Sequence, residues 1–564
     1  MGNVQSRKKE ERRILLLLGI IIIGLLGIAT RLIFIQGVEA KKYDTLALKQ
    51  RLRRIELAPH RGTIYDRDGQ ELAVSVQRET IYATPYLIKK PLHVASKLSP
   101  ILDVNEEILY KKLTRDCGFV YLARKVDQEK AEAVRALEIE GIGFLKENKR
   151  YYPCNSVAAQ VVGFVGVDNK GLTGLELYYD DLLRGRPGEL IVEKDPCGRA
   201  IPGGILQLLP PTDGNSITLT LDRDIQFKTE ETLKKGVEKF HAKSGLAIVM
   251  NPKTGEIYAM ANYPSFDLNN FSKTSSEVIR NRAVTDIYEP GSTVKAIIAS
   301  AALEERLFTP KNIFYLPSTI KVSNKVIKEA HPRPPRNFTF TQIITESSNV
   351  GVVTIGLKLG REKIYEYLSA FGLTEKSRID FPGESKGYVP PPDKWYGTTI
   401  ANIPFGQGLS ATPLQMIQAI SIIANDGLKV RPHLLSSIIS PQGKVVKTFS
   451  RDSGEKVLSS KTTRQMRDIL EQAVDMGTGK TARIPGYRVA GKTGTAQKVK
   501  KYNRGYESGK YIASFVGFVP AQDPQLIILV VIDEPQDAIW GSVAAAPIFK
   551  EIAEFSLRHL RIAP

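Results

Sequence analysis

The order of apolar segments along the sequence predicts an α+β fold preceded by a single membrane-spanning helix. An uncharged apolar run near the start of the chain is long enough to cross a bilayer. Further on, the strand-like segments 217–221, 245–250 and 256–261 precede a helix-rich interior over 275–480. Two more strand-like segments, 511–519 and 526–532, follow this interior. Strands, then helices, then strands again indicate one domain whose sheet is completed by both ends of its sequence.

Length, composition and charge limit the class of protein. The chain has 564 residues and a mass of 62.5 kDa, more than one ordinary core holds, so we expect two or three domains. Hydrophobic residues at 42% and charged residues at 25% exclude a mainly disordered chain. The net charge of +19 suits nucleic acid, anionic lipid and acidic polymers equally. No nucleic-acid-binding motif accompanies it, so we expect no nucleic acid as a partner.

Cysteine and histidine usage argues against a metal site. Cys117, Cys154 and Cys197 form no Cys-x-x-Cys pair, which excludes a zinc ribbon, and their odd number argues against a disulfide scaffold. The six histidines are scattered and form no His-Glu-x-x-His motif. A zinc hydrolase is therefore not expected.

The first element is an uncharged run over 14–30, which resumes after Arg31 as 32–35. A helix needs about 20 apolar residues to cross the bilayer core. The run lacks the small-x-small end of a cleaved signal peptide, so 14–35 is predicted to be an uncleaved transmembrane signal-anchor. Basic residues on both sides leave the positive-inside bias weak. We expect a cytoplasmic tail over 1–13 and a large exported body, because long domains are translocated regardless of local charge.

Two regions follow the signal-anchor. Residues 37–215 mix short elements with many turns and end in the strong turn signal Pro210-Pro211-Thr212-Asp213-Gly214-Asn215. A different pattern begins at 216, where an alternating strand precedes an amphipathic helix and a pair of strands joined by a hairpin signal. The sequence therefore predicts two domains, over 37–215 and 216–564.

Ser292 and Lys295 are the first candidates for chemistry. Pro290 and Gly291 interrupt the preceding chain and start a helix near Ser292, so positions 292 and 295 share one helical face and can touch. The stretch 296–303 is apolar nearly all round, which predicts a buried helix. Burial lowers the pKa of a lysine, and a neutral Lys295 could accept the Ser292 proton. Free N–H groups at the helix start would stabilise an oxyanion.

Two further segments would complete such a site. Ser347 and Asn349 offer a hydroxyl and an amide two residues apart, although this spacing alone is more typical of a cap or turn. The second segment has the pattern of a strand and is Lys492-Thr493-Gly494-Thr495. Its two threonines share one face beside the lysine cation, and its glycine permits close approach, which suits the binding of a carboxylate. No histidine is close in sequence to the three segments, which favours a Ser-Lys mechanism over a Ser-His mechanism.

In this order the three motifs resemble those of the penicillin-recognising serine enzymes. The segments 282–292 and 405–415 are similar to class B penicillin-binding proteins, and 61–69 and 171–176 are similar to the N-terminal pedestal of that class. Glu289 and a threonine at 493 look more like the division (septal) branch, including its sporulation relatives. The resemblance implies a penicillin-binding/β-lactamase-like transpeptidase domain, an antiparallel sheet flanked by helices plus an all-helical subdomain, on a pedestal or dimerisation-type domain.

The resemblance also implies an activity and a role for each residue. Members of this family are D,D-transpeptidases that cross-link peptidoglycan. Ser292 would attack the penultimate D-Ala carbonyl of a stem peptide, with Lys295 as the base. Ser347 would relay protons to the leaving amine, and Asn349 would hold the donor peptide. The terminal carboxylate would be bound by Lys492, Thr493 and Thr495 beside Gly494, and the N–H groups of Ser292 and Thr495 would form the oxyanion hole. β-Lactams would trap Ser292 as an acyl-enzyme, and the resemblance implies that neither a metal nor a cofactor takes part in this chemistry.

The implied partners are peptidoglycan stem peptides, β-lactams, a polytopic glycosyltransferase and other division proteins. The implied location is the bacterial inner or plasma membrane, as a single-pass protein with an extracytoplasmic catalytic domain. Alternatives within the fold are an elongation-type transpeptidase, a D,D-carboxypeptidase and a penicillin-hydrolysing enzyme. A non-catalytic scaffold would be expected to lack Ser292 or Lys295, and a β-lactam sensor would need a signalling domain.

Two charged segments outside the motifs have less specific interpretations. Arg61, Asp66 and Arg67 are predicted to form an internal charge network that braces the domain junction, with a contact to partner proteins as the alternative. The segment 498–510 is predicted to be a solvated hairpin loop, with contact to an anionic wall polymer as the alternative.

Overall fold

The computed structural model describes residues 2–193, 201, 206–449, 454–500 and 505–564. Cys197 falls outside this part, whereas Cys117 and Cys154 are free thiols. The chain forms two compact units, one from residues 1–59 and 186–212 and the other from 60–185 and 213–564. The predicted domain limits, 37–215 and 216–564, stay predictions.

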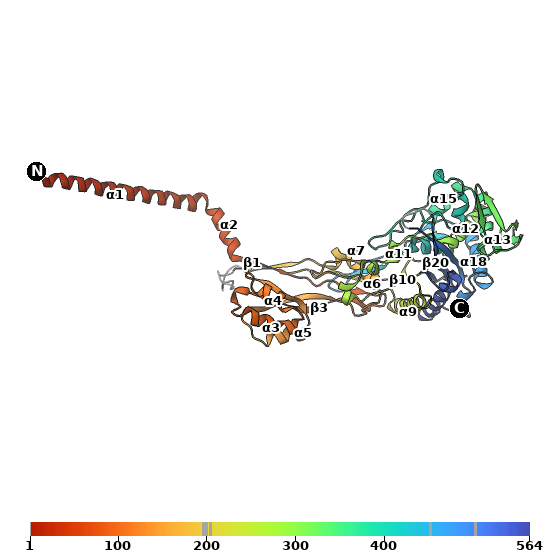
Figure 1. Cartoon of the computed structure of the whole chain (residues 1–564), viewed down its shortest axis with the longest axis horizontal. Helices are drawn as coiled ribbons and strands as arrows, with labels where there is room; N and C mark the ends of the chain where they lie inside the picture. The colour runs from red at the N-terminus through yellow and green to blue at the C-terminus, as the bar shows by residue number, and fades with distance from the viewer. Residues whose placement is uncertain (1, 194–200, 202–205, 450–453, 501–504) are drawn as a thin grey trace. The chain divides into compact units, whose positions relative to one another are not determined.

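The smaller unit contains the apolar helix. Helix α1 (Gly2–Ile33) continues through a π-helical turn, η1 (Phe34–Val38), as Figure 1 shows in red. The span Arg7–Val38 has a window of mean hydropathy 2.5 with no residue buried, and it is the one helix of the described chain that is long and apolar enough to cross a membrane. After α2 (Ala40–Arg51) the unit ends in a three-stranded antiparallel sheet in the order β1-β6-β7: Leu52–Leu57, Gly188–Glu193 and Leu206–Leu209.

The larger unit begins with a seven-stranded sheet. Its strand order is β17-β16-β8-β2-β3-β4, with β5 also paired to β3. The long strand β3 (Glu71–Ala83) pairs with β5 (Ile142–Tyr151) along ten positions, from Val74↔Tyr151 to Ala83↔Ile142. The remaining strands of this sheet are β2 (Ile64–Tyr65), β4 (Val120–Val126), β8 (Ser216–Leu219), β16 (Leu435–Ile439) and β17 (Val445–Thr448). A separate apolar core forms beside it, contributed mainly by β3, β4, α3 (Pro91–Leu102), α4 (Glu106–Leu113) and α5 (Gln128–Arg135).

One predicted strand forms but pairs with different strands than expected. The segment 217–221 was expected in the sheet of the second domain, and it forms β8. Strand β8 pairs instead in parallel with β2 and antiparallel with β16. Alternation predicts a strand but carries no information on which distant strand it pairs with.

The five-stranded antiparallel sheet confirms the prediction that strands from the beginning and the end of the domain sequence form one sheet. Its order is β10-β9-β21-β20-β19, so the early hairpin β9 (Ser244–Met250) and β10 (Ile257–Tyr263) joins three late strands: Ala490–Val499, Tyr506–Val519 and Leu526–Asp533 for β19, β20 and β21. Every residue of β9 is buried. Alternate residues of β9 belong to two separate cores, so both faces of the sheet are covered. Helices α9 (Arg223–Lys239) and α20 (Ala546–His559) pack on one face, and α17 (Pro413–Ala424) packs on the other.

The predicted helix-rich interior lies between the two strand groups. It contains the buried helices α12 (Val294–Glu304) and α14 (Asn349–Leu359). It also contains α13 (Phe340–Thr345), α15 (Arg361–Ala370) and α18 (Ser460–Asp475). Figure 1 shows α12, α13, α15 and α18 close to one another at the green and blue end of the chain. Two small antiparallel sheets interrupt this interior, which the apolar pattern did not predict. Strand β11 (Ile313–Leu316) pairs with β14 (Arg336–Thr339), and the hairpin of β12 (Thr319–Val322) and β13 (Lys325–Lys328) lies between them in sequence.

The predicted charge network of Arg61, Asp66 and Arg67 is divided. The Arg61 guanidinium donates to Glu176 at 2.6 Å and to Asp180 at 2.7 Å. Asp66 instead accepts backbone N–H groups of its own turn, at Asp68 and Gln70, and contacts the Arg223 N–H at 3.3 Å. Arg67 stacks over the Tyr258 ring at 4.4 Å. Asp66 and Arg67 therefore reach residues beyond 216, whereas Arg61 stabilises the region before 186.

The predicted hairpin loop at 498–510 lies partly outside the described residues, which omit 501–504. Lys498 pairs with Asp533 at 2.7 Å and with Glu534 at 2.6 Å. Lys510 pairs with Glu507 at 2.8 Å. These two lysines are engaged by carboxylates of the protein, which does not favour a role in binding an anionic polymer.

Candidate active site

Ser292 lies in a tight turn in front of α12. Residues Gly291–Thr293 form a 3₁₀ turn, and Val294 begins the α-helix. Gly291 has a φ of +59°, and a Cβ atom at Gly406 (φ +82°) would overlap the Gly291 carbonyl oxygen. The Ser292 side chain is partly buried, and its hydroxyl makes no hydrogen bond to any described residue. The turn thus presents a hydroxyl that no structural partner occupies.

Lys295 is fully buried in the first turn of α12. Its Nζ donates to the Ser347 carbonyl oxygen at 2.6 Å and to Asn349 Oδ1 at 2.7 Å, and it lies 3.3 Å from Ser347 Oγ. Burial lowers the pKa of Lys295 well below its ordinary value, the Lys492 cation lowers it further, and Glu329 partly opposes both. The predicted buried, weakly basic lysine is therefore present.

The predicted contact between Ser292 and Lys295 is not made as a hydrogen bond between these described residues. The two carbonyl oxygens of Ser347 and Asn349 accept only, so they take two N–H groups of the amine. In the neutral form of Lys295 the lone pair is left for a hydroxyl. Ser292 lies in the 3₁₀ turn before α12 and Lys295 lies in the first turn of α12, so the shared helical face stays a prediction. The sequence spacing could not show the acceptors that orient the amine.

Ser347 sits at a strained turn between two helices. Its φ is +60°, the left-handed conformation that usually requires glycine at this position after a helix. The Ser347 N–H bonds to Ile344 O and the Ser348 N–H bonds to Ile343 O, which closes α13, while the Ser348 hydroxyl caps α14 through the Gly351 N–H. Residue 347 is thereby forced out of both helices, with its carbonyl oxygen and its hydroxyl toward the two buried lysines.

Both ends of the Asn349 side-chain amide make a hydrogen bond. Its Oδ1 accepts from Lys295, and its Nδ2 donates to the Lys328 carbonyl oxygen at 3.0 Å. Its backbone N–H donates to Glu329 Oε2 at 2.6 Å. The last residue of β13, Lys328, thus takes one of the two Nδ2 N–H groups, and the other is left for a ligand.

Glu329 is a site residue that the sequence analysis did not identify. Its side chain is 6% exposed and pairs with Arg333 at 2.7 Å. It also accepts the Ser348 hydroxyl at 2.6 Å and the Asn349 N–H. A single glutamate after a strand belongs to no sequence motif, so nothing in the sequence placed Glu329 in the site. The β12–β13 hairpin brings Glu329 to the Ser347–Asn349 turn.

The predicted Lys492–Thr495 strand is β19. Lys492 is 1% exposed, donates to Ser347 Oγ at 2.9 Å, and has its pKa lowered to about 7 by burial. Thr493 Oγ1 lies 3.0 Å from Thr478 Oγ1, and Thr495 Oγ1 accepts the Gly541 N–H at 3.1 Å. A Cβ atom at Gly494 would overlap Ser514 Oγ and crowd Pro290 O, so this glycine lets β19 approach the Ser292 turn.

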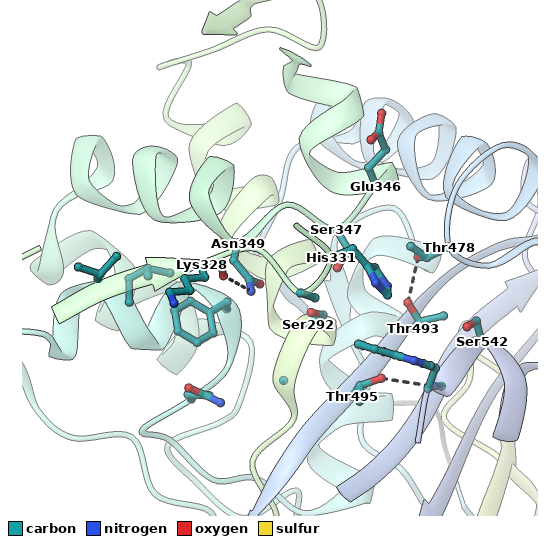
Figure 2. Close-up of a pocket in the computed structure, with 18 of the residues that line it drawn as sticks. Ser292, Lys328, His331, Glu346, Ser347, Asn349, Thr478, Thr493, Thr495 and Ser542 are labelled. Carbon is teal, nitrogen blue, oxygen red and sulfur yellow. Dashed lines mark hydrogen bonds between the residues drawn. The ribbon is translucent and has the colours of Figure 1, made fainter. Parts of the chain in front are cut away.

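A cavity of about 510 Å³ joins these segments. Of the predicted residues it is lined by Ser292, Ser347, Asn349, Thr493 and Thr495, which Figure 2 shows around one opening. Lys295, Lys492 and Gly494 do not line the cavity. The amines of the two lysines instead contact the hydroxyl of Ser347, which does line it.

A histidine also lines the cavity, although no histidine is close to the motifs in sequence. His331 packs against Trp540 with ring centroids 4.7 Å apart, and both rings line the opening. The preference for a Ser-Lys mechanism used the distance along the sequence between the histidines and the three motifs. That distance does not show that His331 lines the same cavity as Ser292. The hydrogen bonds nevertheless favour lysine, because the amines of Lys295 and Lys492 contact Ser347 Oγ, whereas His331 makes no hydrogen bond among the described residues.

One group of possible metal ligands occurs among the described residues, and it lies outside the cavity lining: Asp68, Asp222 and His559. Asp222 already accepts the N–H groups of Asp224 and Ile225 at the start of α9 and contacts His559 Nε2 at 3.0 Å. The group therefore has a structural role as a helix cap.

The arrangement supports acyl transfer to a serine. A free hydroxyl, a buried amine of low basicity and a second hydroxyl between two lysines are the parts of a nucleophile with a general base and a proton relay. A buried cation beside two threonine hydroxyls on an edge strand suits a carboxylate.

Two family models match the chain. The penicillin binding protein transpeptidase domain matches residues 245–554, and the penicillin-binding protein dimerisation domain matches residues 56–219. Together they cover both sequence regions that the turn at 210–215 was predicted to separate.

Named relatives and solved structures agree. Stage V sporulation protein D of Bacillus subtilis is 36% identical over 100% of this chain and 88% of the relative. Peptidoglycan D,D-transpeptidase FtsI of Buchnera aphidicola is 32% identical over 98% of this chain and 96% of the relative. The structure of penicillin-binding protein 3 of Mycobacterium tuberculosis in complex with aztreonam has a TM-score of 0.72 and 30% identity, covering 90% of this chain and 98% of that chain.

Proposed function

The chain belongs to the penicillin-binding protein transpeptidase family as a class B, division-type member, a peptidoglycan D,D-transpeptidase, and from this premise we propose which residues perform the reaction. Peptidoglycan is its substrate and β-lactams bind it, as the domain match and the relatives support. The observation that carries the residue assignment is the convergence of Lys295 and Lys492 on Ser347 beside the unpartnered Ser292 hydroxyl.

Acylation begins when Ser292 Oγ attacks the penultimate D-Ala carbonyl of a stem peptide. Neutral Lys295 takes the proton from Ser292, and the N–H groups of Ser292 and Thr495 stabilise the oxyanion. The new bond joins Ser292 Oγ to the carbonyl carbon, and the bond to the terminal D-Ala nitrogen breaks. The low pKa of Lys295 supports this role, because an ordinary lysine is protonated near neutral pH.

The leaving amine needs a proton, and Ser347 relays it. Ser347 Oγ lies 3.3 Å from Lys295 Nζ and 2.9 Å from Lys492 Nζ, so a proton reaching Lys295 can pass along this chain of hydrogen bonds. An amine of a second stem peptide then attacks the ester and releases Ser292, which completes the cross-link. The same groups act in reverse order in this second step.

The substrate is held by the edge strand and by Asn349. The cation of Lys492 with the hydroxyls of Thr493 and Thr495 binds the terminal carboxylate, supported by their common place on β19. Asn349 Nδ2 binds the donor peptide backbone through its second N–H, while the first stays bonded to Lys328 O at the end of β13.

The protein acts at the membrane with partners. Its apolar helix and its FtsI-like relatives support membrane anchoring. We propose that residues 1–13 are cytoplasmic, that the catalytic domain is extracytoplasmic, and that a polytopic glycosyltransferase and other division proteins bind the span and pedestal.

The deciding experiment is reaction of the purified full chain with a fluorescent penicillin, followed by mass spectrometry of the labelled peptide. The label is expected on Ser292, and Ser292→Ala is expected to abolish labelling while the protein stays folded. Undiminished labelling of that variant would contradict the nucleophile assignment. Release of the penicilloyl group within seconds would instead indicate the penicillin-hydrolysing alternative.

A further inference from the structure

The cavity at Ser292 has a positively charged wall that the proposed mechanism does not use. Strand β13 contributes this wall, and its residues Lys325 and Lys328 both line the cavity. Both residues are exposed, in contrast to the buried lysines beneath Ser347. An exposed ammonium group keeps its charge near neutral pH, so this wall attracts anions.

Neither lysine is neutralised by the part of the chain that the structure describes. The Lys325 amine donates to the neutral side-chain oxygen of Asn402 at 3.3 Å and forms no ion pair with a described residue. The Lys328 amine has neither a hydrogen bond nor an ion pair with a described residue, and only its backbone oxygen is engaged, by Asn349. The charge of this wall is therefore open to a ligand.

The acidic residues near the wall have other partners. Glu329 is buried and pairs with Arg333, and Glu346, which lines the cavity, pairs with Arg336. Glu289 accepts two hydrogen bonds, and burial raises its pKa, an effect that the charge of Lys325 only partly opposes. These three carboxylates leave the two lysine charges available.

The place of Lys328 in the cavity indicates which part of a bound donor peptide it meets. Figure 2 shows Thr493 and Thr495 on one side of Ser292. It shows Asn349 and Lys328 on the other side, where the Lys328 carbonyl oxygen accepts Asn349 Nδ2 at 3.0 Å. A donor with its terminal carboxylate at the threonines and its reacting carbonyl at Ser292 therefore continues past Asn349 to Lys328.

The third residue of the stem peptide, which precedes the two terminal D-alanines, is the part of the donor that meets this wall. It follows the reacting carbonyl by one residue, about 3.5 Å of extended chain, and its long side chain can reach further. Two amines on one wall suit a carboxylate, which accepts charge-assisted hydrogen bonds from both. An uncharged side chain would leave both amines without an ionic partner.

We propose that Lys325 and Lys328 select donor stem peptides whose third residue carries a free carboxylate at the end of its side chain, over peptides in which that group is amidated or absent. This inference rests on the proposed function, because it uses the donor orientation that Ser292 and the threonines define. The two lysines contact the substrate but form and break no bond. They determine which donor is acylated and leave the chemistry of acylation to the groups around Ser347.

The test compares three soluble pentapeptides as donors for the full chain in detergent. All end in D-Ala-D-Ala, and their third residue is a diamino acid with a free side-chain carboxylate, the same residue with a carboxamide, or lysine. The free acid should have a kcat/KM for release of the terminal D-Ala about fivefold higher than the other two, the upper range for an exposed ion pair. This preference should fall as the salt concentration rises from about 0.1 M to about 1 M, because exposed charges are screened.

Variants assign the preference to the wall. Lys328→Gln and Lys325→Gln should each lower it to about twofold or less, whereas Lys328→Arg should retain it because the charge persists. The matched control is Lys321→Gln, which removes an exposed lysine of the same hairpin that does not line the cavity, and it should keep the parent preference. The readout is a ratio of two peptides on one protein, so a general loss of activity does not imitate the effect.

The remaining outcomes separate this proposal from the proposed function. Equal rates for the three peptides in the parent, or an unchanged preference in both glutamine variants, would overturn the selection by the lysines. Turnover of no peptide by a protein whose Ser292 reacts with penicillin would overturn it as well. A protein that penicillin does not label would contradict the proposed function instead. The preference of the parent and its salt dependence keep the test decisive where a variant fails to fold.

Discussion

Lys295 and Lys492 direct their amines at the same hydroxyl: Lys492 Nζ lies 2.9 Å and Lys295 Nζ 3.3 Å from Ser347 Oγ. Both lysines are buried, and the positive charge of Lys492 lowers the pKa of Lys295. The charge of Lys492 therefore favours the neutral form of Lys295. Four predictions concern this arrangement and the elements that hold it.

The acylation rate should depend on pH with two limbs. The base acts in its neutral form, so acylation should rise as pH increases through a pKa that burial places well below the usual lysine value. Binding of an anionic substrate needs charged Lys492, whose pKa is about 7, so the rate should fall at higher pH. Stopped-flow acylation by a β-lactam between pH 5 and 10 would measure both limbs. In Lys492→Arg the falling limb should vanish, because guanidinium stays charged throughout. An unchanged falling limb in that variant would exclude Lys492 as its origin.

Lys295→Ala should lower the acylation rate by about 10²–10⁴-fold, the usual contribution of a general base. The fold should persist, because the carbonyl groups of Ser347 and Asn349 that lose their donor border the cavity and can bind water. Thermal unfolding provides the control. A folded variant that acylates at the parent rate would remove Lys295 from the mechanism.

Glu329→Gln should lower acylation about tenfold through the geometry of the Ser347–Asn349 turn. The variant keeps an acceptor for Ser348 but loses the charge that binds Arg333 and the Asn349 N–H. Glu329 also opposes the lowering of the Lys295 pKa, so the rising limb of the pH profile should move to lower pH.

The matched control for Glu329 is Glu346→Gln. Glu346 lines the same cavity but pairs with Arg336 at an exposed position. We expect near-parent acylation and an unshifted profile there. Equal effects of the two substitutions would show that Glu329 acts through general charge alone.

Gly406→Ala should disrupt the Ser292 turn. The added Cβ would overlap the Gly291 carbonyl oxygen, and Gly406 also has a left-handed φ, so both the turn and the backbone would be strained. Acylation should fall at least about 100-fold, with a lower Tm. Gly443→Ala is the control for conformation alone, because Gly443 has a φ of +79° and no atom within 4 Å of its Cβ position. It should cost about 1–2 kcal/mol of stability and leave acylation intact.

The sequence predicted well what depends on local pattern. The predicted strand over 245–250 and the apolar run of 526–532 correspond to β9 and β21, and the buried helix after Ser292 corresponds to α12. The order of the three motifs identified the family. These features are local in the chain, and periodicity or spacing is enough to identify them.

Pairings between distant segments were not predicted. Glu329 and His331 reach the cavity because the β12–β13 hairpin carries them there, and no local signal marks either residue. The partner of β8 and the separation of Asp66 and Arg67 from the Arg61 network were missed for the same reason. The conformation of Ser347 was also missed, because a serine at φ +60° is held by the two helix ends around it and not by its own preference.

The interleaved order of the five-stranded sheet has a consequence for biosynthesis. Strand β9 is made early, yet one of its edges stays unpaired until β21, close to the end of the chain, has been synthesised. An apolar strand with an open edge is prone to pair with other chains. Nascent protein is thus exposed to aggregation while residues 251–525 are synthesised, and any shortened product that ends before residue 526 retains that open edge.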